Sequence, residues 1–327
     1  MREFLEKTLR QNVIMTENKE VYKKLPLAYR GRYDIFTVET NGILWMAIHP
    51  KDDIGLVVLR RDRAGVEKMT GLNCAIFLDR TTFYIKEKLM EENNWQQRTE
   101  LLLGEEKMKR IRASHVLVVG LGGVGAYAAE MLCRAGVGRM TIVDADTVQP
   151  ANMNRQLPAM HSTLGMPKAE VLAARYKDIN PDIELTVLPV YLKDENIPEL
   201  LDSAKFDFIV DAIDTISPKC FLIYEAMKRH IKIVSSMGAG AKSDITQICF
   251  ADLWDTYHCG LSKAVRKRLQ KMGVKRKLPV VFSTEQADPK AVLLTDDERN
   301  KKSTCGTVSY MPAVFGCYLA EYVIKRI

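Results

Sequence analysis

From about Val116 onward, short apolar runs alternate with amphipathic stretches. HVLVV, MTIVDAD and ELTVLPV have the character of strands, whereas AYAAEMLCRAG and KAEVLAARYKDIN between them have helical spacing. Further strands are expected at 206–213 and 232–236. Continuous apolar runs suit strands buried on both faces, which favours parallel strands joined by helices. The pattern therefore predicts an α/β fold: a Rossmann-like, doubly wound, mostly parallel sheet with flanking helices.

The first 89 residues have a different pattern. YDIFTVE and ILWMAIH are strand-like and are separated by the turn-forming pair Asn41-Gly42, and TFYIKEKLMEE has helical character. We expect residues 1–89 to form a small appended α+β unit, of unknown role, without a catalytic signature. The segment MEENNWQQRTELLLGEE, which begins at Met90, suits a helix that opens a second domain over residues 90–327.

The composition of the chain indicates its cellular compartment and the charge of its partners. Seven cysteines with no C-x-x-C pair fit a reduced, cytosolic setting. The net charge of +7 favours anionic partners. The most apolar window, Tyr310 to Ile324, is shorter than the roughly 20 residues of a spanning helix, and it contains Glu321. We expect a buried terminal helix in a cytoplasmic protein that has no membrane contact.

A glycine-rich loop follows the strand HVLVV directly. Gly120, Gly122 and Gly125 give the G-x-G-x-x-G pattern, with Gly123 as an additional glycine, and the loop opens into a helix. Backbone amides of such a loop, together with the helix N-terminus, bind phosphate oxygens. Asp144 ends the next strand, where a carboxylate can accept hydrogen bonds from ribose hydroxyls. The constellation predicts a nucleotide site.

The residues after Asp144 distinguish hydride transfer from nucleotidyl transfer. Asn152, Arg155 and Gln156 follow closely, and Lys168 opens the next helix. Two fixed cations beside a phosphate-binding loop suit a triphosphate, because they neutralise charge on a departing pyrophosphate. A dinucleotide dehydrogenase has no need of them. We therefore expect ATP rather than NAD.

In their order, GLGGVG, DAD, NMNRQ, GMPKAE and DAIDT resemble the motifs of the ubiquitin-activating-type adenylyltransferases, which include the ThiF, MoeB and HesA proteins. The resemblance implies that Asp144, with Asp146 in the same motif, binds the ribose side of ATP. It implies that Asn152, Arg155, Gln156 and Lys168 contact the phosphates, and that Asp214 helps to bind Mg²⁺. Arg98 resembles the family's arginine that reaches into the neighbouring protomer's ATP site, which implies a homodimer. Arg98, Arg155, Lys168 and Asp214 are the candidate catalytic residues.

A strongly basic stretch, SKAVRKRLQKMGVKRK, contains no acidic residue and suits a phosphate backbone. On a helix, Lys263, Lys267 and Lys271 share one face, while Leu261, Val265 and Leu269 pack inward. The candidate tRNA-binding cations are Lys263, Arg266, Lys267, Arg268, Lys271, Lys275, Arg276 and Lys277. A solvated helix surface is the alternative explanation.

Together with DAIDT, GAGAKSD, VVFSTE and SYMPAVFG, this stretch resembles the tRNA threonylcarbamoyladenosine dehydratases from about residue 94 to the C-terminus. Such enzymes use ATP to adenylate the carboxylate of threonylcarbamoyladenosine in tRNA, and an internal attack then closes a ring and expels AMP. GAGAKS is expected to be a strand-end turn that lines the site, with Lys242 close to substrate.

Two other functions remain open at this point. One is an adenylyltransferase for a ubiquitin-like sulfur-carrier protein, and the other is a non-enzymatic nucleotide sensor or nucleic-acid binder. The carrier activators usually hold a structural zinc in two C-x-x-C pairs, which this chain lacks, so we expect no structural zinc. Cys259, Cys305 and Cys317 are individually possible nucleophiles, but we expect no thioester. A sulfur-transfer or other accessory partner remains possible.

Overall fold

The computed structural model describes residues 14–17, 33–40, 43–50, 57–61, 95–294 and 303–327. The chain divides into two compact units, Met1–Trp95 and Gln96–Ile327. Each unit is described by itself.

The first unit contains an antiparallel sheet in the order β1-β2-β3-β4. β2 (Tyr33–Thr40) and β3 (Ile43–Pro50) pair across Asn41-Gly42, with Thr40 opposite Ile43. The two strands expected here are therefore confirmed. β1 (Ile14–Glu17) and β4 (Val57–Arg61) were not expected from the pattern. The helix expected at TFYIKEKLMEE lies outside the described residues.

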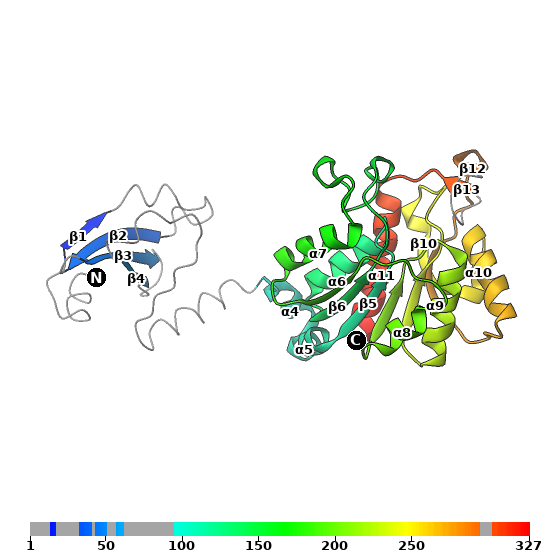
Figure 1. The fold of residues 1–327 in the computed structure, drawn as a ribbon, viewed down its shortest axis with the longest axis horizontal. Coiled ribbons are helices and arrows are strands. Elements are labelled where there is room, and N and C mark those ends of the chain that lie inside the picture. The colour runs from blue at the N-terminus through cyan, green and yellow to red at the C-terminus, as the bar shows by residue number, and fades with distance from the viewer. Residues whose placement is uncertain (1–13, 18–32, 41–42, 51–56, 62–94, 295–302) are drawn as a thin grey trace. The chain divides into compact units, whose positions relative to one another are not determined.

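The second unit is built on a seven-stranded sheet, ordered β10-β11-β9-β8-β5-β6-β7 (Figure 1). All neighbouring strands are parallel except the edge pair β10 and β11. The strands are β5 (His115–Val119), β6 (Arg139–Val143), β7 (Glu184–Leu188), β8 (Phe208–Asp211), β9 (Ile233–Ser236), β10 (Ile248–Asp252) and β11 (Pro279–Ser283). The predicted Rossmann-like, mostly parallel sheet is confirmed.

Eight helices accompany this sheet in the described residues: α4 (Gln97–Leu103), α5 (Glu105–Ala113), α6 (Gly125–Ala135), α7 (Lys168–Ile179), α8 (Ile197–Asp202), α9 (Ile216–Lys228), α10 (Gly260–Lys271) and α11 (Tyr310–Arg326). A short hairpin of β12 (Val292–Leu294) and β13 (Ser303–Cys305) precedes α11.

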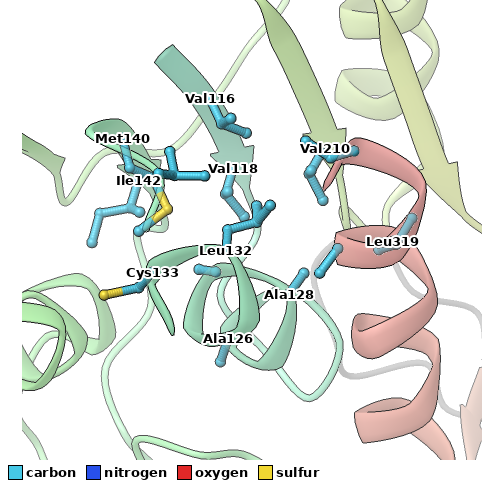
Figure 2. Packing of buried hydrophobic residues seen from close by; sticks show 14 of the residues in the cluster. Val116, Val118, Ala126, Ala128, Leu132, Cys133, Met140, Ile142, Val210 and Leu319 are labelled. Carbon is cyan, nitrogen blue, oxygen red and sulfur yellow. The ribbon is translucent and has the colours of Figure 1, made fainter. Parts of the chain in front are cut away.

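Alternate residues of β5 supply two separate hydrophobic cores. Val116 and Val118 face α6, α7 and α11, and Figure 2 shows them beside Ala128, Leu132 and Leu319. The intervening residues, Leu117 and Val119, belong to the core with α8, α9 and α10. Both faces of the sheet are covered at β5, which explains why its residues 116–119 are all apolar.

The helix expected from Met90 differs in its bounds. Residues 90–94 lie outside the described part, α4 begins only at Gln97, and the segment breaks at Gly104. Gly104 adopts a φ of +81°, a conformation that interrupts a right-handed helix and that glycine tolerates best. α4 and α5 are therefore two helices rather than one.

The terminal helix is buried along one side, as expected. Met311, Phe315, Leu319 and Val323 recur every four residues of α11, and all are fully buried. Gly316 allows a close approach to α6, since a Cβ atom there would lie 2.5 Å from the carbonyl oxygen of Val124. Within the described residues, we found no helix long and apolar enough to cross a bilayer.

Candidate nucleotide site

The strand order reverses direction between β5 and β8. From β5 the chain proceeds to β6 and β7 on one side, and from β8 to β9 and β11 on the other. In open α/β sheets, such a switch point leaves a crevice outside the carboxyl ends of the strands, where ligands bind. We call this edge, which carries the residues following β5, β6 and β8, the carboxyl edge.

The glycine loop at the carboxyl edge depends on backbone approaches that only glycine allows. Gly120 has a φ of +86°, and a Cβ atom there would lie 2.8 Å from the carbonyl oxygen of Ala212, which follows β8. Gly125, the first residue of α6, would place a Cβ atom 1.7 Å from the carbonyl oxygen of Gly120. The loop is therefore a tight turn that leads directly into the N-terminus of α6.

Asp144 ties the residues after β6 to this loop. Its carboxylate accepts hydrogen bonds from the backbone N–H of Leu121 at 2.6 Å and of Asp146 at 2.8 Å. Burial raises the pKa of Asp144, while the positive charge of Lys168 and the two N–H donors act in the opposite direction. A carboxylate with a raised pKa costs stability when it is ionised, and this cost disappears as the pH falls through that pKa. Such a perturbed acid in a crevice is typical of a functional position.

Lys168 lies beside both acids of the DAD motif. Its ammonium forms a 2.9 Å ion pair with Asp146, and its side chain is only 5% exposed, whereas that of Asp146 is 70% exposed. The backbone N–H of Lys168 also donates to the carbonyl of Asp146 at 3.0 Å. A buried cation at the start of α7 is therefore held near Asp144, where it can meet an anionic ligand.

The NMNRQ motif brings the Gln156 side chain and the Arg155 backbone to the glycine loop. The Gln156 amide nitrogen would lie 3.6 Å from a Cβ atom at Gly122, and the Arg155 carbonyl oxygen 3.4 Å from one at Gly123. The amide oxygen of Gln156 is buried and has no hydrogen-bond partner among the described residues. Arg155 donates to the carbonyl of Ala151 at 2.9 Å, and Asn152 accepts from the N–H of Gln149 at 3.1 Å. Gln156 therefore carries an acceptor that a ligand can satisfy.

Asp214 is exposed and lies two residues beyond Ala212, the residue that packs against Gly120. The loop that carries it is anchored by a group that the sequence patterns did not reveal. Asp211 and Lys219 form a fully buried ion pair at 2.8 Å, and Ser235 donates to the same carboxylate at 2.6 Å. In the sequence, only the presence of Asp211 in DAIDT and of Lys219 eight residues later could have suggested this ion pair. Nothing in the sequence marks either side chain as buried.

Two candidate residues lie apart from this cluster. Arg98 is exposed on α4, a helix that buries none of its residues. Lys242 is buried, and its ammonium donates to the carbonyl of Ser283, the last residue of β11, at 2.7 Å. Burial lowers the pKa of Lys242. Its proximity to substrate stays a prediction.

The basic stretch forms α10 and the loop that follows it. Val265 and Leu269 are fully buried and Leu261 is half-buried, whereas Lys263, Lys267 and Lys271 are exposed, as the helical spacing predicts. The helix ends at Lys271, because Gly273 has a φ of +78° and the N–H groups of Gly273 and Val274 cap the last turn. Lys275, Arg276 and Lys277 therefore follow in a loop.

Two arginines of the basic stretch are engaged with the protein itself. Arg266 donates to the Leu253 carbonyl at 3.2 Å and the Thr256 carbonyl at 2.7 Å, and it also contacts the Thr256 hydroxyl. Arg276 donates to the Met227 carbonyl at 3.3 Å. These two side chains are less available to a polyanion than the exposed lysines of α10. Within the described residues, no group of three or more potential ligands could hold a metal ion by itself.

Comparison with known proteins gives a family and a set of relatives. The ThiF family matches residues 96–327. The tRNA threonylcarbamoyladenosine dehydratase of Bacillus subtilis (strain 168) is 38% identical over 234 residues, which cover 69% of this chain and 92% of that protein. The crystal structure of the E. coli tRNA N6-threonylcarbamoyladenosine dehydratase TcdA in complex with ATP superimposes with a TM-score of 0.64 at 34% identity, and the match covers 72% of this chain and 95% of that one. The molybdopterin-synthase adenylyltransferase of E. coli (strain K12) is 33% identical over 156 residues, covering 48% of this chain and 61% of that protein.

Proposed function

The chain belongs to the ThiF family, and on that premise we propose that it is an ATP-dependent tRNA threonylcarbamoyladenosine dehydratase. The observation that carries this conclusion is the share of each relative's length that the chain matches. The similarity extends over 92% of the Bacillus subtilis dehydratase and 95% of the E. coli TcdA chain, whereas the E. coli molybdopterin-synthase adenylyltransferase is matched over 61% of its length. We place the activity in residues 90–327 and assign no role to residues 1–89. We also propose that the protein acts in the cytoplasm, because seven cysteines without a C-x-x-C pair fit a reducing compartment.

ATP binds across the carboxyl edge. The amides of the glycine loop and the N-terminus of α6 meet its phosphates, and Asp144 accepts hydrogen bonds from its ribose. The ion pair of Lys168 with exposed Asp146 leaves the ammonium close to Asp144, and its charge also lowers the pKa of that acid. This placement lets Lys168 neutralise phosphate oxygens, together with Arg155 and the amides of Asn152 and Gln156.

Mg²⁺ fits beside Asp214. This ion commonly takes one or two protein carboxylates and completes its octahedron with phosphate oxygens and water. Asp214 is an exposed carboxylate just beyond the chain segment that packs on Gly120, so the residue present suits such a site. When bound, Mg²⁺ stabilises negative charge on the phosphates.

The chemistry is an acyl activation followed by ring closure. A carboxylate oxygen of threonylcarbamoyladenosine bonds to the α-phosphorus of ATP, and the bond to the pyrophosphate oxygen breaks. An atom of the carbamoyl group then attacks the acyl carbon, loses a proton, and expels AMP with the former carboxylate oxygen. The net change in the nucleoside is loss of one water. A carboxylate is a poor acyl donor and AMP is a good leaving group, so no protein nucleophile is needed.

Two contacts outside the nucleotide cluster complete the proposal. The exposed lysines of α10 bind the tRNA backbone, because each neutralised phosphate releases counterions. Arg98 lies on a helix that buries none of its residues, and we infer that it completes the ATP site of a second copy in a homodimer.

One assay tests this function. The full chain is incubated with ATP, Mg²⁺ and tRNA that carries threonylcarbamoyladenosine, and AMP release and nucleoside mass are followed. We expect equal amounts of AMP and dehydrated nucleoside. Asp214→Ala or Arg155→Ala should slow turnover by roughly a hundredfold or more, whereas Asp182→Ala, an exposed acid before β7, should leave turnover unchanged. An unaltered nucleoside mass, together with AMP transfer to a carrier protein's C-terminus, would select the adenylyltransferase function instead.

A further inference from the structure

We propose that the exposed ring of Tyr257 stacks on a nucleobase of the RNA substrate, next to the adenosine that is modified. The inference rests on the proposed function, because it requires an RNA substrate. It adds a base contact to a site whose other proposed RNA contacts are to phosphates.

Tyr257 is a large aromatic residue that the fold leaves in solvent. Its side chain is 50% exposed, although its neighbour Phe282 on β11 is 2% exposed. Among the described residues its hydroxyl makes no hydrogen bond. The exposed part of the Tyr257 ring therefore packs in neither hydrophobic core, and a ligand can contact it.

The ring is held in place from one side. It makes edge-to-face contacts with Phe282, at 5.6 Å between centroids, and with His258, at 5.0 Å. His258 is itself fixed, since its Nδ1 atom lies 3.0 Å from the Thr284 carbonyl oxygen. A rigid aromatic side chain loses little conformational freedom on binding, so most of the stacking free energy appears as affinity.

Tyr257 lies at the carboxyl edge, three residues before α10. The next residues reach the ends of β11 and β9: His258 contacts Thr284, and the Cys259 sulfur accepts the N–H of Gly238 at 3.4 Å. α10 then begins at Gly260 and carries Lys263, Lys267 and Lys271 along its exposed side. An aromatic ring at one end of a row of cations is the arrangement that binds single-stranded nucleic acid.

The strand order separates Tyr257 from the ATP ribose. β11, which supports the ring, lies three strands from β5 and four from β6, which Asp144 follows. At the usual strand spacing, these separations are about 14 Å and 19 Å. β8, which precedes Asp214, lies only two strands from β11, about 10 Å away. A base on Tyr257 is therefore nearer to the Asp214 loop than to Asp144, the proposed ribose acid.

RNA loops offer the matching chemistry. Sequence-dependent RNA recognition uses unstacked loop bases that stack on aromatic side chains, and a nucleoside that enters an enzyme site must leave its own stack. A flanking base released in this way has an exposed π-face. Tyr257 offers a surface that replaces the lost stacking.

The test uses the full chain and a short RNA hairpin that carries threonylcarbamoyladenosine in its loop. Binding is measured by fluorescence anisotropy for Tyr257→Ala, Tyr257→Leu and Tyr257→Phe. We expect the alanine variant to raise the Kd for the hairpin by roughly 5- to 150-fold, the range for loss of one stacked base. Phenylalanine should restore affinity to within about twofold, and leucine should not, because the contact needs an aromatic face.

Tyr191→Ala serves as the matched control, because Tyr191 is 48% exposed and follows β7 at the other end of the sheet. It should leave the hairpin Kd unchanged. The Kd for ATP should be the same in every variant. A weaker ATP affinity in Tyr257→Ala would overturn the proposal, because the ring would then contact the nucleotide. An unchanged hairpin Kd in Tyr257→Ala would also overturn it, provided that the wild-type protein binds the hairpin and releases AMP. A wild-type protein that neither binds the hairpin nor releases AMP would overturn the dehydratase function as well.

Discussion

Lys219 and Asp211 form a fully buried ion pair, and both side chains also hydrogen-bond the backbone of Ile213. The Lys219 ammonium donates to the Ile213 carbonyl at 2.9 Å, and the Asp211 carboxylate accepts the Ile213 N–H at 3.1 Å. Ile213 immediately precedes Asp214. The pair therefore fixes the backbone from which the proposed Mg²⁺ ligand projects, and it links the start of α9 to the end of β8.

Removing one partner of this pair should be strongly destabilising. Lys219→Met leaves a buried carboxylate without its counter-charge, which costs about 3–5 kcal/mol. For a unit of this size, Tm should fall by roughly 6 to 20 °C in calorimetry. The double variant Lys219→Met with Asp211→Asn should recover part of the loss, because neither charge remains. Lys109→Met breaks an exposed pair with Glu105 and should leave Tm unchanged.

A second measurement distinguishes positioning from stability alone. In the double variant, the Mg²⁺ concentration at half-maximal turnover should rise, whereas the KM for tRNA stays constant, because Ile213 has lost its anchor but α10 has not. Equal shifts in both quantities, or none, would show that the pair only stabilises the fold.

Gly120 should tolerate no side chain, for two separable reasons. Its φ of +86° alone costs an alanine about 1–2 kcal/mol. The added Cβ atom would also meet the Ala212 carbonyl oxygen at 2.8 Å. Gly273→Ala shares only the first problem, since its φ is +78° and nothing lies within 4 Å of the added atom. Urea unfolding should show a larger loss for Gly120→Ala, and calorimetry should show a roughly tenfold or greater loss of ATP affinity for that variant alone. Matching losses in the two variants would contradict the role of the close approach.

The hydrophobic pattern predicted five of the seven strands, β5 to β9, because strands buried on both faces favour continuous apolar runs, but it did not predict β10 and β11. Element ends were harder to predict. The strand expected over 206–213 ends at Asp211, because the Asp211 carboxylate bonds the N–H of Ile213 and turns the chain. Similarly, the helix expected from Met90 is interrupted by the conformation of Gly104. Both differences arise from single local interactions, which the hydrophobic period of a longer segment does not reveal.

The candidate site was predictable where a motif fixes backbone geometry, and less so where a side chain finds a distant partner. The glycine loop and Asp144 meet as the sequence indicates, with Leu121 donating to the carboxylate. Lys219 looks like a surface lysine in the sequence, but its side chain is fully buried and pairs with Asp211 at the end of β8, eight residues earlier in the chain. Arg266 looks like its basic neighbours, yet it is held by a preceding loop. Such pairings depend on tertiary packing.

No cysteine thiol should be needed for turnover. Burial raises the pKa of Cys133 and Cys220 to about 12, so both remain neutral thiols at pH 8 and should resist iodoacetamide until the protein unfolds. A combined Cys259→Ser, Cys305→Ser and Cys317→Ser variant should retain AMP release, because the proposed ring closure uses the substrate's own nucleophile. Serine also preserves the helix cap at Cys259, whose sulfur accepts the N–H of Ser262. Loss of dehydration with adenylate formation intact would instead reveal a covalent thiol intermediate.

Neighbouring cations on α10 should differ in what they do. Lys267 is exposed, so Lys267→Met should leave Tm unchanged and lower the slope of log affinity for tRNA against log salt by about 1. Arg266 is half-buried and donates to the Leu253 and Thr256 carbonyls, so Arg266→Met should cost about 1–3 kcal/mol in urea unfolding. For Arg266→Met, the slope of log affinity for tRNA against log salt should equal that of the wild type, because the guanidinium already donates to protein carbonyls. Parallel titrations of the two variants with tRNA at several salt concentrations measure both quantities. A reduced slope for Arg266→Met would mean that this arginine releases its carbonyl partners to bind phosphate.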